Sequence, residues 1–422
     1  MGLYLILTIL ITISAFFAYL NNRYIRMPFV IGLFFLSTLL SLAILACGFW
    51  DMQQYAAIRK VVRQVDISKL VLEIMLGFLL FAGSFHTRWL DIRSQIRPIT
   101  FFAVCGVLCS TIIIGGLLYY TCQLLQVPVS VLHCLIFGAL ISPTDPIAVL
   151  GILTKANVPR KIESTIVGES LFNDGVGVVV FIALLQTLQL GRDTIDFGQF
   201  GLLFLQEAIG GVLSGLVLGY GLHRLLKSID NYETEVLLTI AFVMAGYSTC
   251  LYFHLSAPLA MVIMGLFVGN YKQKAAMSDQ TLEYVHKFWE LLDVVLNAIL
   301  FILIAFVLVV IDFKVSYLII SALTVLIVLL SRILIVFLPR LLLPGRTGFS
   351  SNESKILVWG GLRGGLSLAL VLSLPESEAK NLLLVITYSC VVFSILVQGL
   401  TIGKLAKRLL RSQSAAAPAG SQ

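Results

Sequence analysis

Two aspartates lie in stretches of the chain that are otherwise apolar enough to span a bilayer. Asp145 is in the segment LIFGALISPTDPIAVLGIL, and Asp174 is in STIVGESLFNDGVGVVVF. A charged carboxylate at that depth costs about 2.5–3.5 kcal/mol on insertion scales, and ionisable residues within a membrane commonly mark ion or proton pathways. We therefore expect Asp145 and Asp174 to form the centre of a site for a cation and for protons.

Two prolines flank Asp145 and predict an interruption in its helix. Pro143 and Pro146 have no N–H group. The carbonyls of Ala139 and Ser142, four residues earlier, therefore lose their usual donors. Freed carbonyls at membrane depth are tolerated where they line a cavity or meet a ligand, and a small monovalent cation is a suitable ligand. A simple proline kink is the alternative, but the Thr-Asp pair between the prolines favours an ion site.

The helix that carries Asp174 offers further polar groups. Ser170 and Asp174 are four residues apart and share one helical face, with Glu169 and Asn173 on the adjoining face. A hydroxyl and a carboxylate on one face can bind a cation. Glu169 needs a partner in hydrocarbon, and Arg363 is the obvious candidate. The alternative is that Glu169 lies at a helix end and is hydrated.

The composition of the 422-residue chain is that of a multi-pass membrane protein. Hydrophobic residues make up 59% of it, charged residues only 12%, and the mean hydropathy is +0.99. No soluble core of this size needs so much apolar surface. Windows of about 20 apolar residues predict an all-α polytopic protein with thirteen transmembrane helices, near 2–20, 28–47, 70–87, 99–122, 132–153, 164–190, 200–222, 235–253, 258–270, 291–311, 315–338, 354–373 and 381–403.

The positions of Lys and Arg predict the orientation of the chain. Most of the 29 basic residues fall in loops after odd-numbered spans or after the last span. Because cytoplasmic loops carry the excess of positive charge, we expect the N-terminus outside and the C-terminus in the cytoplasm, in a plasma membrane of the bacterial inner-membrane type. The net charge of +7 then reflects loops that face anionic lipid. It does not indicate nucleic-acid binding, because the charges are dispersed.

A second interrupted span predicts an inverted repeat. The fifth span is broken at 143–146, and the twelfth is broken at 360–365, where the sequence reads GGLRGG. The offset between the two spans is odd, so they enter the membrane from opposite sides. Two inverted six-helix repeats joined by a linker helix would produce this pattern, with the ion site at the crossing of the broken helices.

Three motifs give the chain a resemblance to a known family. They are SPTDP at 142–146, GESLFNDG at 168–175 and GGLRGG at 360–365. Over nearly its whole length the chain resembles monovalent cation/proton antiporters of the sodium/proton exchanger superfamily, on the NhaP-like electroneutral branch. The resemblance implies a homodimer whose protomer is a single transporter domain, 1–411. Spans 1–3 and 7–10 would form a dimerisation part, and spans 4–6 and 11–13 a moving core. Residues 412–422 are expected to be a disordered tail.

The same resemblance implies a set of ion-binding groups. Na⁺ would be bound by the carboxylates of Asp145, Asp174 and Glu73, the hydroxyl of Ser170 and the main-chain carbonyl of Thr144. Asn173 would hold the broken helix, and Glu169 and Arg363 would form a structural ion pair. For Glu73, near the outer end of its span, a hydrated interfacial glutamate is the alternative. The electrogenic branch of the superfamily carries a second aspartate at the place of Asn173, so we expect electroneutral exchange.

These features predict a secondary active antiporter that exchanges Na⁺ or Li⁺ for H⁺, because cation and protons compete for the same carboxylates. The sequence has no nucleotide-binding motif, so an existing gradient must drive transport, and we expect neither enzymatic activity nor a cofactor. K⁺/H⁺ exchange is the alternative among transporters. A cation channel and an intramembrane aspartyl protease are distant alternatives, and neither aspartate has the Gly-x-Gly-Asp motif of such a protease.

Other charged residues and the cysteines have weaker claims to a role in transport. Arg332 is expected to be a structural charge, whereas Glu207 and Asp293 are expected near hydrated helix ends. The seven cysteines include no Cys-x-x-Cys pair, and we expect them to pack as small hydrophobic side chains.

Overall fold

The computed structural model describes residues 3–48, 51–63, 65–156, 158–191, 197–270, 278–311, 314–342 and 348–416. Within these ranges the chain is helical and contains no strand. Nine of the described helices are long and apolar enough to cross a membrane, and two more, Val131–Ile141 and Ala257–Asn270, are apolar but shorter. The chain is therefore a multi-pass, all-helical membrane protein.

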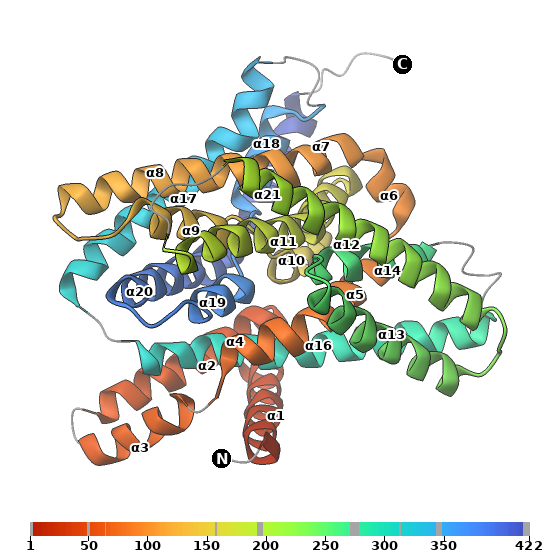
Figure 1. The fold of residues 1–422 in the computed structure, drawn as a ribbon, viewed down its shortest axis with the longest axis horizontal. Helices are drawn as coiled ribbons and strands as arrows, with labels where there is room; N and C mark the ends of the chain where they lie inside the picture. Colours follow the sequence, from red (N-terminus) through yellow and green to blue (C-terminus); the bar gives the residue numbers. More distant parts are fainter. Residues whose placement is uncertain are drawn as a thin grey trace.

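The helices are numbered in chain order, as in Figure 1. The first group consists of α1 (Leu3–Leu20), α2 (Phe29–Cys47), α3 (Met52–Arg63), α4 (Ile67–Lys69), α5 (Leu76–Phe85), α6 (Trp89–Ser94), α7 (Ile96–Thr100), α8 (Val107–Leu124), α9 (Val131–Ile141), α10 (Ile147–Lys155) and α11 (Arg160–Gln189). The second group consists of α12 (Phe197–Leu226), α13 (Tyr232–Tyr252), α14 (Ala257–Asn270), α16 (Asp279–Val310), α17 (Val315–Leu342), α18 (Ser351–Trp359), α19 (Gly365–Leu372), α20 (Glu378–Val392) and α21 (Gly399–Ala416).

Short π-helical turns join some of these helices end to end. They are η2 (Leu70–Met75) between α4 and α5, η3 (Phe101–Gly106) between α7 and α8, and η4 (Phe393–Gln398) between α20 and α21, while η1 (Asn21–Ile25) follows α1. A π-helical turn adds a residue to the helical repeat. The faces of the helix before and after it are therefore out of register.

Serine side chains mark the starts of several helices. Because the first N–H groups of a helix have no partner within it, a side-chain oxygen there stabilises the end. Ser130 caps α9 and Ser278 caps α16. Ser350 and Glu353 form a reciprocal capping box at the start of α18. These caps define the entries of three helices that surround the candidate site.

Two helical segments are interrupted where the prolines and glycines predicted. The first interruption, residues 142–146, separates α9 from α10, and the second, residues 360–364, separates α18 from α19. In Figure 1, α9, α10 and α11 lie near the centre of the view, with α1 and α3 at its lower edge and α12 and α13 to the right. Ser142, Thr144, Leu362 and Arg363 are buried, so both interruptions lie inside the bundle.

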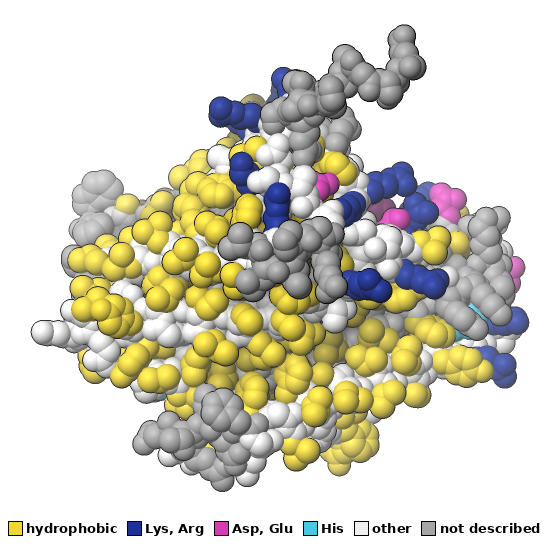
Figure 2. Space-filling view, turned by 90° about the horizontal axis from the view of Figure 1, so that it is seen from above, with side chains coloured by type: hydrophobic (Ala, Val, Ile, Leu, Met, Phe, Trp, Pro, Cys, Tyr) yellow, Lys and Arg dark blue, Asp and Glu magenta, His cyan; other side chains and the backbone are white. Residues whose placement is uncertain are grey.

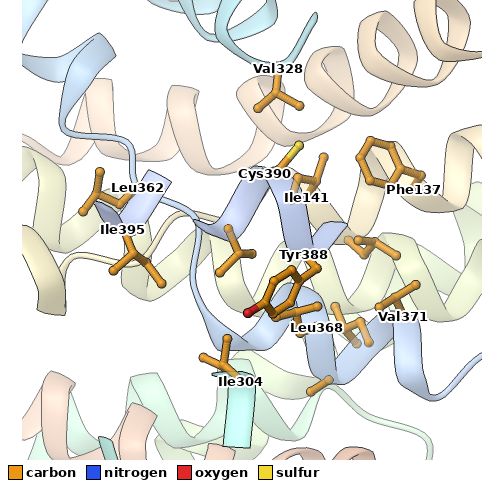
Figure 3. Close-up of a cluster of buried hydrophobic side chains, with 14 of the residues drawn as sticks. Phe137, Ile141, Ile304, Val328, Leu362, Leu368, Val371, Tyr388, Cys390 and Ile395 are labelled. Atoms are coloured by element: carbon orange, nitrogen blue, oxygen red, sulfur yellow. The ribbon is translucent and has the colours of Figure 1, made fainter. Parts of the chain in front are cut away.

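A large cluster of buried hydrophobic side chains packs around the interruptions. Figure 3 labels ten of its members, which come from α9, α16, α17, α19, α20, η4 and the second interruption: Phe137, Ile141, Ile304, Val328, Leu362, Leu368, Val371, Tyr388, Cys390 and Ile395. Such packing shields the irregular backbone from lipid. Non-helical backbone is tolerated at membrane depth under that condition.

The outside of the molecule is apolar over wide areas, as lipid contact requires. In Figure 2, hydrophobic side chains cover the left and lower parts of the visible face, whereas Lys and Arg side chains lie from its upper middle to its right edge. α12 is the clearest case of an apolar exterior, because Leu202, Leu205, Leu213 and Val217 are all more than half exposed. These side chains fit a hydrocarbon environment better than water.

Two elements differ from the sequence-based prediction. α3 is an additional helix between the second and third predicted spans. α21 continues past the predicted end of the last span to Ala416, and residues 417–422 of the expected tail lie outside the described part of the chain. All seven cysteines are free, and four of them are buried.

Candidate ion-binding site

The two interrupted segments contact each other directly. The N–H of Asp145 donates to the carbonyl of Leu362 over 2.8 Å. The guanidinium of Arg363 donates from one nitrogen to the carbonyl of Pro143, over 3.0 Å, and to the carbonyl of Ser142. Each interruption therefore provides hydrogen-bond partners for main-chain groups that the other interruption leaves without a partner in its own half-helices.

The carbonyls next to the prolines have partners other than the predicted cation. The carbonyl of Ala139 accepts from the N–H of Ser142 at 3.4 Å, and the carbonyl of Ser142 accepts from Arg363. A fixed side-chain cation thus neutralises part of the first interruption. The side chains around it and the main-chain carbonyl of Thr144 remain as the candidate ligands for a mobile ion.

Thr144 connects the first interruption to α11. Its N–H donates to Oδ1 of Asn173 over 3.3 Å, its hydroxyl accepts from Nδ2 of Asn173 over 2.9 Å, and the same hydroxyl lies 2.9 Å from Oγ of Ser170. The contact expected of Asn173, which was predicted to hold the broken helix, is therefore present. Gly177 further along α11 allows the ring of Pro143 to pack closely, because any side chain at this glycine would overlap the ring.

One cavity of about 790 Å³ is lined by both membrane aspartates. Asp145, Asp174, Thr144 and Ser170 all line it. Within the described residues, no hydrogen-bond donor contacts the carboxylate of Asp174, and no Lys or Arg lies within 4.0 Å of either aspartate. The cavity therefore presents two carboxylates without a fixed counter-ion in the described chain.

Contacts with Ile147 and Gly364 determine the position of the Asp145 side chain. Its Oδ1 accepts from the N–H of Ile147 over 2.9 Å and so satisfies a free N–H at the start of α10. Its other carboxylate oxygen lies against Gly364, where a β-carbon would overlap the carboxylate. The glycines of the second interruption thus make room for the acid of the first.

Glu169 has a partner, but not the predicted one. Arg332 of α17 donates to both carboxylate oxygens of Glu169, with an Nη2–Oε2 distance of 2.9 Å, and also donates to the carbonyl of Leu357 over 3.1 Å. The two side chains are only 7% and 2% exposed. The prediction of a Glu169–Arg363 pair is therefore wrong, and so is the alternative of a hydrated Glu169. Arg363 instead bonds to the first interruption.

Glu73 is not brought into this group. It lies in η2, its side chain is exposed, and it does not line the cavity that contains Asp145 and Asp174. The π-helical turn around it changes which face of the segment points inward. A prediction based on a helical repeat of 3.6 residues could therefore not identify the direction in which Glu73 faces.

Two other acids lie elsewhere than expected. Asp293 was predicted near a hydrated helix end, but it lies within α16 and lines the cavity together with Asn297. Glu207 lies within α12 and is 7% exposed. The four-residue spacing of Asp293 and Asn297 in an apolar run was the one signal that could have indicated a shared face.

Comparisons with known proteins extend these observations. The family described as "Sodium/hydrogen exchanger, transmembrane" matches residues 11–408. The chain is 44% identical over 412 residues to the Na⁺/H⁺ antiporter NhaP of Pseudomonas aeruginosa, covering 96% of each protein. It is 36% identical over 363 residues to the Na⁺/H⁺ antiporter NhaH of Halobacillus dabanensis, covering 82% of this chain and 83% of that protein.

A solved structure shares the fold. The sodium proton antiporter MjNhaP1 from Methanocaldococcus jannaschii, determined at pH 8, superposes with a TM-score of 0.73 at 20% identity, over 96% of this chain and 97% of that one. The family match covers both interruptions and α11, which are the elements that build the cavity. The chain therefore belongs to the sodium/hydrogen exchanger family of transmembrane proteins.

Proposed function

We propose that this chain is a secondary active antiporter that exchanges Na⁺ or Li⁺ for H⁺. The observation that carries the proposal is the cavity lined by Asp145 and Asp174, for which the described chain provides no fixed counter-ion. The names of NhaP and NhaH, its relatives in two bacteria, state Na⁺/H⁺ antiport for those proteins. An antiporter needs a site that either protons or a cation can neutralise, and two adjacent carboxylates meet that need.

The mechanism is competition at one site. Na⁺ is bound by carboxylate oxygens of Asp145 and Asp174, with the hydroxyl of Ser170 and the main-chain carbonyl of Thr144 as further ligands. Protonation of the carboxylates removes the charge that attracts the cation, so proton and cation exclude each other. An empty, charged site is costly to move through the membrane. The core therefore changes sides only when the site holds a cation or is protonated.

The architecture that performs this movement is the one inferred from the sequence. The protomer has thirteen transmembrane helices, arranged as two inverted six-helix repeats with a linker helix, and it forms a homodimer. Spans 1–3 and 7–10 form the dimerisation part, and spans 4–6 and 11–13 form the moving core. The contact between the two interruptions, from Asp145 to Leu362, supports a core that moves as one body.

The orientation of the chain in the membrane follows from the distribution of Lys and Arg among its loops. The N-terminus lies outside and the C-terminus in the cytoplasm of a bacterial-type inner membrane. Arg88, Asp91 and Glu163 are among the residues that line the cavity, and in the proposed orientation they belong to or border cytoplasmic loops. In that orientation the cavity opens towards the cytoplasm.

A single aspartate on α11 supports electroneutral, one-for-one exchange. Asn173 precedes Asp174 and cannot carry a proton in transport, because an amide does not titrate. Both ends of its side chain already bond to Thr144. Asp174 is therefore the principal proton carrier, and Asp145 contributes mainly to cation binding.

The first experiment measures proton movement in proteoliposomes with a pH-sensitive dye after addition of Na⁺, Li⁺ or K⁺. We expect Na⁺ and Li⁺ to drive exchange, and Asp174→Asn, a nearly isosteric change, to abolish it. Asp91→Asn is the matched control, because Asp91 lines the same cavity but lies next to Arg88, at 3.8 Å. Wild-type exchange by the Asp174 variant would refute the site, and exchange driven by K⁺ alone would favour K⁺/H⁺ antiport.

The second experiment tests the stoichiometry. Once K⁺ is shown not to be transported, valinomycin can clamp the membrane potential while Na⁺ and pH gradients oppose each other. A potential of about 100 mV is worth roughly 2.3 kcal/mol per net charge moved, which is roughly fiftyfold in a gradient. We expect the Na⁺ gradient that balances a fixed pH gradient to be the same at every potential. A balance point that moves with voltage would show electrogenic exchange.

A further inference from the structure

α16 carries an acid and an amide that the mechanism above does not use. Asp293 and Asn297 lie one turn apart on this helix, and both line the cavity that contains Asp145 and Asp174. α16 packs against α2 and α5, and it is not part of either interruption. The two residues therefore belong to a different wall of the cavity from Asp145 and Asp174.

The hydrogen bonds of this pair are incomplete. Nδ2 of Asn297 donates to Oδ1 of Asp293 over 3.0 Å and to its main-chain carbonyl over 2.9 Å. The amide oxygen of Asn297 accepts no hydrogen bond in the described structure, although the residue is only 1% exposed. No Lys or Arg of the described chain forms an ion pair with Asp293. A buried amide oxygen without a donor is rare and calls for a partner.

A cation is the partner that fits these groups. Carboxylate and amide oxygens are ligands that hard cations prefer. A simple structural pair on a helix would explain the bond between Asp293 and Nδ2, but it leaves the amide oxygen without a partner. A cation bound by the amide oxygen of Asn297 and by the carboxylate of Asp293 would satisfy both groups.

We propose that Asp293 and Asn297 form a second cation-binding station, which holds a partly hydrated Na⁺ in the cavity before the ion reaches Asp145 and Asp174. This inference rests on the proposed function of the cavity. In the proposed architecture α16 belongs to the static part, whereas the two aspartates of the central site belong to the moving core. The station therefore loads the core in one state and loses contact with it in the other.

The station acts on cation capture rather than on the translocation step. A negative group in a cavity with low-dielectric walls raises the local concentration of cations. Removing its charge should raise the Na⁺ concentration needed for half-maximal exchange. The maximal rate should change little, because Asp145 and Asp174 still bind and release the transported ion once it arrives.

The test compares KM for Na⁺ and maximal rate in proteoliposomes at fixed pH and ionic strength. Asp293→Asn should raise KM by about fivefold or more, with a maximal rate within about twofold of wild type. Asn297→Leu should raise KM in the same direction, and Asp293→Glu, which restores the charge, should bring KM back towards wild type. Glu290→Gln is the control, since Glu290 lies on the same helix, lines the same cavity and is exposed; its KM should stay near wild type.

Three results would overturn the station. They are a wild-type KM for Asp293→Asn, an equal rise in KM for Glu290→Gln, or a loss of maximal rate in Asp293→Asn that Asp293→Glu does not repair. Asp174→Asn is measured alongside. An active Asp174 variant refutes the proposed central site, whereas an inactive Asp174 variant with an unaffected Asp293 variant refutes only the station.

Discussion

The ion pair between Glu169 and Arg332 gives the most direct test of how the core is held together. The two guanidinium nitrogens of Arg332 bond to the two carboxylate oxygens of Glu169, and both side chains are almost fully buried. Arg332→Gln would leave Glu169 charged and unpaired in a low-dielectric interior. Breaking a buried pair in this way costs about 3–5 kcal/mol. We expect Arg332→Gln to lower the thermal stability of the purified protein strongly.

The double variant separates the pair from the individual side chains. Glu169→Gln with Arg332→Gln replaces two charges by two amides that can still bond to each other. More than half of the lost stability should return, because no uncompensated charge remains. Lys287→Gln is the control. The ion pair between Lys287 and Glu283 has a short N–O distance of 2.6 Å, but both side chains are about two-thirds exposed. The melting temperature of the Lys287→Gln variant should therefore equal that of the wild type.

The assay is the melting temperature in detergent, followed by intrinsic fluorescence and by the loss of the monodisperse peak in gel filtration. Arg363→Gln is measured in parallel, and Glu169→Gln in that background should give no recovery, because the two residues do not bond. If Arg332→Gln melted with the wild type, or if Glu169→Gln rescued Arg363→Gln, the observed pairing would be wrong.

Two further predictions concern the interruptions. Asn173→Ala removes two hydrogen bonds to Thr144. This change should cost about 1–3 kcal/mol of stability, measured by the melting temperature, because buried polar groups lose their partner. The role given to Asn173 would be contradicted if Asn173→Asp kept the wild-type melting temperature and its balancing Na⁺ gradient still did not depend on voltage. Gly364→Ala places a methyl group against the carboxylate of Asp145. It should raise KM for Na⁺ and lower stability less than Asn173→Ala does. A wild-type KM in the proteoliposome assay would show that the close approach of Gly364 to Asp145 is unimportant. Gly116→Ala is the control, because a β-carbon there meets open space.

Local chemistry in the sequence determined the membrane character of the chain and the places of the interruptions. Pro143 and Pro146 lack N–H groups wherever they are placed, and the glycine run at 360–365 carries little helix propensity. The candidate acids Asp145 and Asp174 were identified in the same way, because a carboxylate in an apolar run is costly regardless of the fold. These conclusions depend only on residues close together in the chain.

Partnerships across the bundle were decided by the tertiary structure. Two buried arginines could have paired with Glu169, and only the packing of α17 against the core shows that Arg332 does so while Arg363 bonds to the first interruption. Glu73 lies in the π-helical turn η2 and does not line the cavity, and such a turn leaves no clear sequence signal. Asp293 was misplaced for a related reason. The apolar run was predicted to begin at residue 291, which put Asp293 near its end, whereas α16 begins at Asp279 and continues through Asp293.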